Sequence, residues 1–289
     1  MTRFGPVFLA AALAVGSVGL VPGRAQAQGA SNQIDIPHHI ANSHEVETPF
    51  GVWHLPRWEP IHLGGLSIDM SPTKHLVYML LAAVLVALVF IPSARVIQGA
   101  QARGRPSKGF AGAMEATALY IRQEVILPNV GHHGDGYVPY LLTLFFFILA
   151  MNLLGLLPWG ATATGNIAVT AALAVVAFLV IEVTGMMALG PVGYAKTIFY
   201  LPSGLPGGIG KLAKPFALAV RLFANMTSGH VLVLALIGLT FLFQSWAVGI
   251  GASILATGVM LLEVFVAFLQ AFVFTLLTAV FIGLMRAEH

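Results

Sequence analysis

The sequence contains no cysteine and very few charged residues. The missing thiols exclude disulfide bonds, cysteine nucleophiles and thiolate metal sites. Without cysteine, the sequence gives no indication of the redox compartment. Only 9% of the 289 residues are charged, against about 25% in a typical soluble domain. Hydrophobic residues make up 58% of the chain and the mean hydropathy is +0.88, more apolar surface than a soluble core of this length could bury. The composition therefore predicts an all-α polytopic membrane protein in a lipid bilayer.

The sequence also lacks a Walker-type glycine loop, so we expect no ATP chemistry in this chain and no catalysis by the chain alone. We expect no cofactor. The net charge of +3 lies mostly in short loops, and it therefore reports membrane topology and predicts no nucleic-acid partner. Five histidines precede the first hydrophobic run of the predicted membrane domain, but their spacing matches no metal-ligand motif, so we favour solvated loop histidines and expect no metal; they are His38, His39, His44, His54 and His62.

The first 27 residues have the pattern of a signal peptide. Arg3 gives the basic start, Val7–Val21 the apolar core and Ala25-Gln-Ala27 a small-x-small cleavage site. The alternative is a first transmembrane helix, although the core is short for a comfortable span. Residues 28–74 are then an extracytoplasmic N-terminal segment, and residues 75–289 a helical membrane domain.

Five hydrophobic runs in this domain predict about five transmembrane helices; they cover 75–92, 138–158, 166–189, 215–243 and 247–285. Basic residues follow the first run and separate the third from the fourth, which places those loops in the cytoplasm. The N-terminus is then extracytoplasmic and the C-terminus cytoplasmic. Residues 109–127 predict an amphipathic helix on the cytoplasmic surface, which we interpret as an interfacial connector.

The last two runs form a hairpin over 212–286, joined at Gln244-Ser-Trp246. The fifth run alone would make a helix about 58 Å long, against a hydrocarbon core of about 30 Å. No proline or charged loop interrupts it. We therefore predict two long helices that are steeply tilted, with an axis about 60° from the membrane normal.

Arg221 lies several residues inside the fourth run. An arginine near the bilayer centre costs about 2.5–3.5 kcal/mol, so it must face protein, water or a counter-charge. Asn225 and Ser228 follow at i+4 and i+7, on the same helix face. Snorkelling or a structural role in the helix bundle is the alternative. An intramembrane cation on a polar stripe indicates part of an ion path.

Glu263 and Gln270 are seven residues apart on the fifth run, hence on one face and about 10 Å apart along the axis. We expect Glu263 to meet His230 near the outer end of the hairpin, with Gln270 and Arg221 deeper. A titratable pair at the outer opening and the fixed charge of Arg221 at the inner end suit an aqueous proton path. The alternative is a buried histidine–glutamate hydrogen bond that only pins two helices.

Two further polar residues, Asn152 and Glu182, lie inside the second and third runs. A single buried asparagine usually connects helices. A buried carboxylate needs a partner or a water path, so Glu182 is a candidate for the proton path or for an ion pair.

Three motifs, in order, resemble the a subunit of the F-type ATP synthase membrane sector. They are FFFILAMNLLGLLP at 145–158, Arg221-Leu-Phe-Ala-Asn225 preceded by Lys214-Pro215, and Leu269-Gln-Ala-Phe-Val-Phe-Thr-Leu-Leu-Thr278. The resemblance covers about residues 130–286. It implies a stator subunit that passes protons through two offset half-channels to and from the carboxylates of a rotating c-ring.

By this resemblance Arg221 is the essential gate that prevents a proton short-circuit. The outer half-channel is then lined by Asn225, His230, Glu263 and Gln270, with Glu182, Ser228 and Asn152 as further candidates. In many bacterial members the positions of His230 and Glu263 hold glutamate and histidine instead. This exchange keeps one of each and favours a pair. Gly207 stands where some relatives have a carboxylate, so no residue is assigned to the cytoplasmic half-channel.

The implied partners are the c-ring, the b-type peripheral stalk subunits and the rest of the ATP synthase, in a bacterial inner membrane. Two other functions remain as alternatives. A secondary transporter predicts internal repeats, and none is visible. In a non-transporting subunit of a membrane complex, Arg221 would be structural. The coupling ion, H⁺ or Na⁺, stays open because its carboxylate belongs to the ring.

Overall fold

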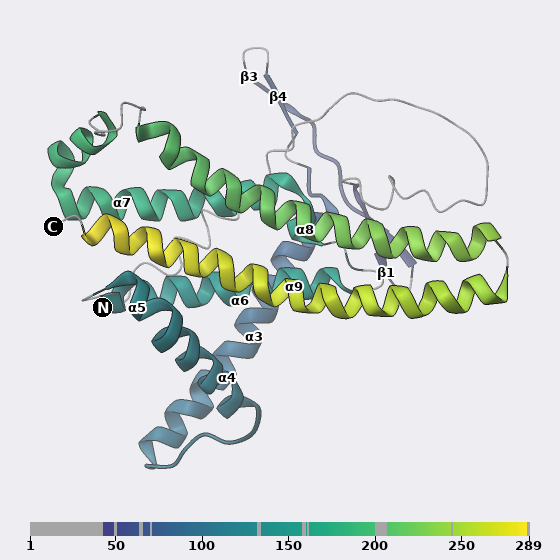
Figure 1. Ribbon diagram of the computed structural model, residues 1–289, viewed down its shortest axis with the longest axis horizontal. Coiled ribbons are helices and arrows are strands. Elements are labelled where there is room, and N and C mark those ends of the chain that lie inside the picture. The colour runs from purple at the N-terminus through teal and green to yellow at the C-terminus, as the bar shows by residue number, and fades with distance from the viewer. Residues whose placement is uncertain are drawn as a thin grey trace.

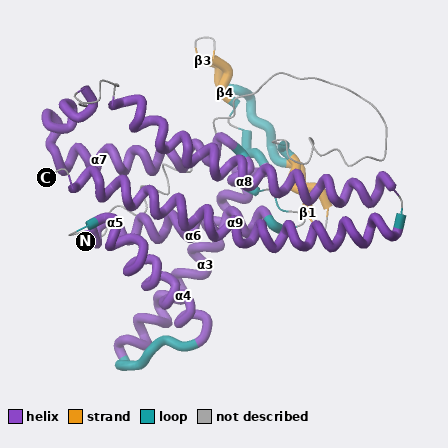
Figure 2. Tube along the Cα trace, viewed as in Figure 1, coloured by secondary structure: helices purple, strands orange, loops and turns teal. Residues whose placement is uncertain are grey.

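The computed structural model describes most of the chain after residue 42: residues 43–48, 51–63, 66–69, 71–131, 134–157, 160, 162–199, 207–243 and 245–287. The predicted signal peptide lies outside the described residues. Within them helices dominate, as Figure 2 shows, and five are long and apolar enough to cross a membrane. The predicted fold class is therefore confirmed.

The five long helices correspond to the five predicted runs; they are α3 (Lys74–Ala102), α6 (Val138–Gly155), α7 (Ile167–Phe199), α8 (Gly207–Phe243) and α9 (Trp246–Ala287). Helices α6, α7, α8 and α9 run side by side along the long axis of the molecule (Figure 1). Helix α3 crosses this group and packs on α6. Buried side chains from α6 and α7 form much of the core.

The hairpin helices are at least as long as the sequence predicts. Helix α9 is one continuous helix of 42 residues over about the predicted range, whereas α8 has 37 residues because it begins at Gly207, before the predicted start at residue 215. At 1.5 Å per residue they are about 63 and 56 Å long, roughly twice the hydrocarbon thickness of about 30 Å. Because α3 crosses this pair (Figure 1), the helices cannot all stand perpendicular to one bilayer. The length of α8 and α9 favours a steep tilt of these two helices, as the sequence predicts.

Of the predicted ends of the first and third runs, the structure contradicts one and confirms the other. The first run was expected to end at Pro92, and this is wrong, because α3 continues through Pro92 to Ala102. Proline removes one backbone hydrogen bond, whereas unwinding the helix in lipid would leave several polar groups unpaired. The predicted end at Leu189 is confirmed, since Gly190 has a non-helical backbone with φ of 70°.

The predicted connector over 109–127 is a chain of three short elements: α4 (Gly109–Tyr120), the π-helical turn η1 (Ile121–Ile126) and α5 (Leu127–Val130). Ile121 and Val125 are buried in the core. Phe110, near the start of this predicted amphipathic helix, is 63% exposed, because α4 extends away from the bundle along α3 (Figure 1). Of these three apolar residues, only the two in the second half of the segment are therefore packed against protein.

The N-terminal segment contains strands that the sequence did not lead us to expect. Strand β1 (Glu45–Thr48) pairs antiparallel with β2 (Gly51–His54), and β3 (Ile61–Leu63) pairs antiparallel with β4 (Leu66–Ile68). Strands of three or four residues are too short to show a hydrophobic alternation. Figure 2 shows that the strands lie on the side of the molecule away from α4.

The C-terminal end of α9 is fixed against the connector. A Cβ on Gly283 would overlap the carbonyl oxygen of Asn129, next to the last residue of α5. One turn of α9 later, Arg286 donates from Nη1 to the carbonyl oxygen of Val130 at 3.1 Å, and its guanidinium lies 5.7 Å from the centre of the Tyr137 ring. Backbone contact at a glycine and one cationic hydrogen bond together hold this end of the helix.

We predict that Gly283→Ala destabilises the folded chain by about 1–3 kcal/mol, because the methyl group must push α9 away from the Asn129 carbonyl. Thermal unfolding of the purified assembled complex measures the loss. Gly99→Ala is the matched control, since nothing lies within 4 Å of a Cβ there and alanine favours the helix. Equal stability of both variants would contradict the close contact.

Candidate proton-path site

Helix α8 presents Arg221 on an exposed face. Ala217, Ala224 and Ser228 are also exposed, and their spacing of three or four residues places all four side chains on one stripe. No carboxylate among the described residues is recorded in an ion pair with Arg221. The charge therefore points out of the chain, with small side chains on both sides of it.

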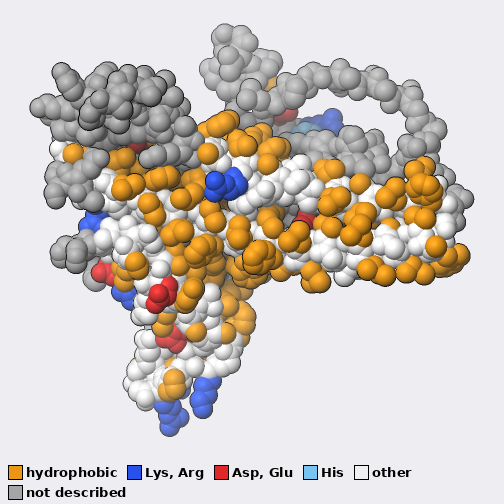
Figure 3. Space-filling view, viewed as in Figure 1, with side chains coloured by type: hydrophobic (Ala, Val, Ile, Leu, Met, Phe, Trp, Pro, Cys, Tyr) orange, Lys and Arg blue, Asp and Glu red, His pale blue; other side chains and the backbone are white. Residues whose placement is uncertain are grey.

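The surface around this stripe is apolar. Figure 3 shows a largely hydrophobic face over α8 and α9, with a basic patch enclosed in it over α8. Exposed side chains of α9 extend this face; they include Ile250, Ile254, Leu261, Phe265 and Phe268. Because a charge enclosed by apolar surface is costly against lipid, the face indicates a partner that carries a negative charge.

The carboxyl group of Glu263 lies against the backbone of α8. A Cβ on Gly229 would overlap Oε1 of Glu263, so glycine leaves the room that this carboxyl group occupies. His230 is the next residue of α8, and both His230 and Glu263 are partly buried. The structure therefore brings Glu263 to the part of α8 that carries His230, which is the neighbourhood the sequence predicts.

A second glycine contact fixes the register of the hairpin. A Cβ on Gly249 would lie 3.2 Å from Cγ2 of Thr240, near the turn between α8 and α9. Away from the turn, Arg221 comes eight residues before Gly229, and Gln270 comes seven residues after Glu263. Both distances are about 10–12 Å along the axes, so Arg221 and Gln270 lie at the same level. They do not share a surface, because Arg221 is exposed and Gln270 is only 3% exposed.

Asn152 links three elements from a fully buried position on α6. Its Nδ2 donates to the carbonyl oxygen of Ala267 on α9 at 3.3 Å, and its Oδ1 accepts a hydrogen bond from the Thr164 hydroxyl at 2.7 Å. Thr164 belongs to the 3-10 turn η3 (Ala163–Gly165). This geometry favours the helix-connecting interpretation of Asn152, while its place on a proton path stays a prediction.

The remaining candidates lie on two helices. Asn225 is partly buried on α8, and the Ser228 hydroxyl donates to its carbonyl oxygen at 3.1 Å. Glu182 is partly buried on α7, which packs on both α8 and α9. Glu182 thus belongs to the helix layer behind the hairpin, and its role in proton transfer stays a prediction.

Two threonine hydroxyls were missed by the sequence interpretation. Oγ1 of Thr227 on α8 and Oγ1 of Thr275 on α9 are buried without a hydrogen-bond partner among the described residues. Threonine in a helix commonly bonds to the carbonyl four residues earlier, as Thr278 does at 2.8 Å. Since unpaired buried hydroxyls are costly, both oxygens are interior polar atoms whose partner the described residues do not supply. No sequence pattern separates these threonines from Thr278.

Comparison with known proteins supplies the family. The family profile described as ATP synthase A chain matches residues 76–283. ATP synthase subunit a 2 of Chlorobium luteolum is 42% identical over 266 residues, covering 88% of this chain and 76% of the relative. ATP synthase subunit a of Chloroherpeton thalassium is 41% identical, with 89% and 78% covered, and that of Anaeromyxobacter dehalogenans is 37% identical, with 87% and 70% covered. The chain belongs to the ATP synthase subunit a family.

The predicted resemblance is thereby confirmed. Members of the ATP synthase subunit a family are the proton-translocating stator subunits of the membrane sector, which agrees with a chain that is not catalytic alone. The matched range contains Arg221 and every other predicted site residue. Strands β1 to β4 precede this range, so the profile match does not extend to the N-terminal hairpins.

We predict that Thr164→Val lowers the stability of the assembled complex by about 0.5–2 kcal/mol, because valine keeps the shape but leaves Oδ1 of Asn152 without its donor. Thr164→Ser, which retains the hydroxyl, is the matched control. Thermal unfolding measures the stability of each variant, and proton flux per assembled complex measures its transport. A valine variant with unchanged stability would show that the Asn152 link does not hold these elements together.

Proposed function

We propose that the exposed face of α8 and α9 is where the c-ring of the ATP synthase turns against this stator, with Arg221 as the gate. The observation that carries the proposal is the exposed guanidinium within an apolar, membrane-length surface. Guanidinium keeps its charge under all physiological conditions. The natural counter-charge is a carboxylate that the ring brings to this level and carries away again.

The gate then works by electrostatics. A deprotonated ring carboxylate within about 4 Å of Arg221 gains about 4 kcal/mol at an effective dielectric constant of 20, and a protonated one gains little. Each ring subunit therefore loses its proton before it passes Arg221 and takes up another afterwards. The fixed positive charge also repels a proton that would cross directly between the two half-channels.

The outer half-channel follows from the hairpin register. His230 and Glu263 form its mouth nearer the α8–α9 turn, and Asn225 and Gln270 line the deeper part toward the level of Arg221. The close approach of Glu263 to Gly229 holds the carboxyl group at α8. Water bound at Thr227 and Thr275 would extend the path, and Glu182, Ser228 and Asn152 are further candidate residues.

The setting of the subunit is part of the same proposal. The N-terminus lies outside and the C-terminus in the cytoplasm, as the distribution of basic loop residues predicts. Besides the c-ring, the b-type stalk subunits contact the chain to hold it against the torque of the ring. Whether the coupling ion is H⁺ or Na⁺ depends on the ring carboxylate.

We predict that Arg221→Ala abolishes ATP-driven proton pumping in membrane vesicles, while passive proton leak through the assembled sector persists. Arg221→Lys restores little, because an ammonium group is more strongly hydrated and can lose its proton in an apolar face. Arg95→Ala is the matched control, since this exposed arginine lies on α3, outside the hairpin.

Pumping and leak are both normalised to the amount of assembled complex. Full pumping by Arg221→Ala would contradict the gate and leave the non-transporting subunit as the better interpretation. Loss of assembly together with an unchanged flux per complex would give Arg221 a structural role.

We also predict that His230 and Glu263 act jointly. His230→Glu alone places two carboxyl groups together, which share a proton and release it less readily. Glu263→His alone leaves two imidazoles and no anion. The double exchange, His230→Glu with Glu263→His, should recover much of the flux, with a coupling energy of about 0.5–3 kcal/mol for residues in contact.

Proton flux per assembled complex separates the two interpretations of this pair. A relay predicts low flux in both single variants and recovery in the double variant. A purely structural pair predicts poor assembly of the single variants but normal flux through those complexes that do assemble. Additive losses in the double variant would show that the two residues do not work together.

A further inference from the structure

The tryptophans of the described residues are all strongly exposed. Trp53 is 69% exposed, Trp58 58% and Trp246 90%. An indole ring combines a large apolar body with a polar N–H group, and tryptophan is enriched where a membrane meets water. Trp246 begins α9 at the turn between two membrane helices, so it marks the depth of one membrane surface. The two N-terminal tryptophans need the same kind of environment.

The N-terminal segment is tied to the point where α3 begins. The ring of His44, next to β1, has Nδ1 at 3.0 Å from the carbonyl oxygen of Pro72. Further along, the backbone N–H of Trp58 donates to the Ser71 hydroxyl at 2.9 Å. Ser71 and Pro72 immediately precede α3. Both contacts therefore hold the segment at the level where α3 passes from the membrane into water.

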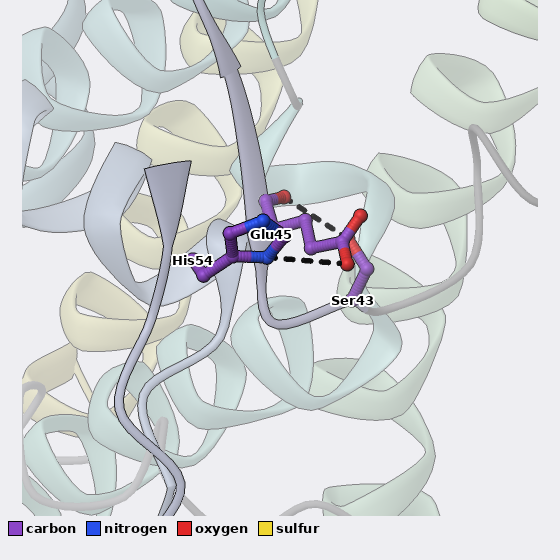
Figure 4. Close-up of polar contacts among 3 residues, drawn as sticks. All are labelled: Ser43, Glu45 and His54. Atoms are coloured by element: carbon purple, nitrogen blue, oxygen red, sulfur yellow. Dashed lines mark hydrogen bonds and ion pairs between the residues drawn. The ribbon is translucent and has the colours of Figure 1, made fainter. Parts of the chain in front are cut away.

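The β1–β2 ribbon carries exposed apolar and polar side chains side by side. Val52, 53% exposed, and Trp53 lie in the middle of β2, where they pair with Glu47 and Val46 of β1. At the open end of the ribbon, Nδ1 of His54 lies 3.3 Å from Oε1 of Glu45, and the Ser43 hydroxyl donates to the Glu45 carbonyl oxygen (Figure 4). Exposed apolar side chains next to exposed polar ones suit a layer whose polarity changes over a few ångströms.

The surroundings of Trp58 have the same mixed character. Arg57 and Glu59 flank it, and both are exposed. Exposed charges of opposite sign therefore stand on both sides of Trp58 in the chain.

We propose that the β1–β2 ribbon and Trp58 rest in the phospholipid headgroup layer, with Trp53 and Trp58 as anchors at the depth of Trp246. In the topology given above this is the outer leaflet. Exposed charges of both signs beside an indole ring, as Arg57 and Glu59 are beside Trp58, suit a zwitterionic headgroup layer better than a purely apolar or a purely acidic protein surface. The ribbon then braces the start of α3 against the membrane. This inference concerns lipid contact and does not depend on the gate at Arg221.

The absence of cysteine allows a direct test in the assembled complex. Single cysteines replace Val52 or Glu59 in a complex whose other subunits lack cysteine, and each carries a fluorophore in phosphatidylcholine nanodiscs. Quenchers are a nitroxide on the lipid headgroup, a nitroxide deep in the acyl chain, and iodide in water. Leu88→Cys, 67% exposed in the middle of α3, is the deep reference. Arg105→Cys, in the exposed loop after α3, is the aqueous reference.

We expect the headgroup nitroxide to quench the labels at 52 and 59 several-fold more strongly than the label at 105, and the deep nitroxide to quench most strongly at 88. Iodide quenching at 52 equal to that at 105 would overturn the proposal, because the ribbon would then stand in water. Protection from all three quenchers would also overturn it, in favour of a covering protein partner. Because both labelled side chains are exposed, the second site remains informative if the first variant does not assemble.

A second variant tests the anchors themselves. Trp53→Ala with Trp58→Ala should shift the label at 59 from headgroup quenching to iodide quenching, since the ribbon loses its interfacial side chains. The label at 88 should not change. An unchanged label at 59 would show that the tryptophans do not seat the ribbon.

Discussion

The cost of a charge in the hydrocarbon layer constrains this structure more than any other interaction. Arg221 lies on an exposed, apolar face of α8, where contact with lipid alone would be strongly unfavourable. Small neighbours at 217 and 224 do not cover it. Lipid alone is therefore a poor environment for this surface. In the proposed function, the surface meets successive carboxylates of the ring, which supply the matching negative charge.

Glycine determines where the helices can come closest. At Gly229 the missing side chain admits the Glu263 carboxyl group to α8, and at Gly283 it lets α9 touch a carbonyl oxygen beside α5. In a membrane there is little hydrophobic force between helices, so close backbone approach and a few hydrogen bonds provide the specificity. Asn152 adds such a bond in the interior. Glycines on otherwise apolar helices thus determine where polar groups of neighbouring elements can come close.

Much of the architecture was predictable because a bilayer limits the possibilities. The lengths of the hydrophobic runs predicted five transmembrane helices, and the absence of a break in the fifth run predicted that α9 is one long helix. The Arg221 motif could be recognised because a charge in such a run is rare. The contacts of Asn152 were not predictable, since its acceptor is 115 residues away. The strands of three or four residues and the passage of α3 through Pro92 depend on local packing and on lipid, which periodicity does not report.

The two halves of α9 differ in how much of their surface is buried, and this difference bears on the proposed proton path. From Ala267 to Ile282 most of its inner side chains are buried, with the Asn152 bond at one end and the Gly283 contact at the other. From Trp246 to Val266 most side chains are exposed, and α8 is the main neighbour. Glu263 lies at the boundary between the two halves. In the proposed function, water reaches this carboxyl group from the less covered half of α9, without passing the packed core. Gln270, only 3% exposed, lies at the level of Arg221, where the proposed path ends.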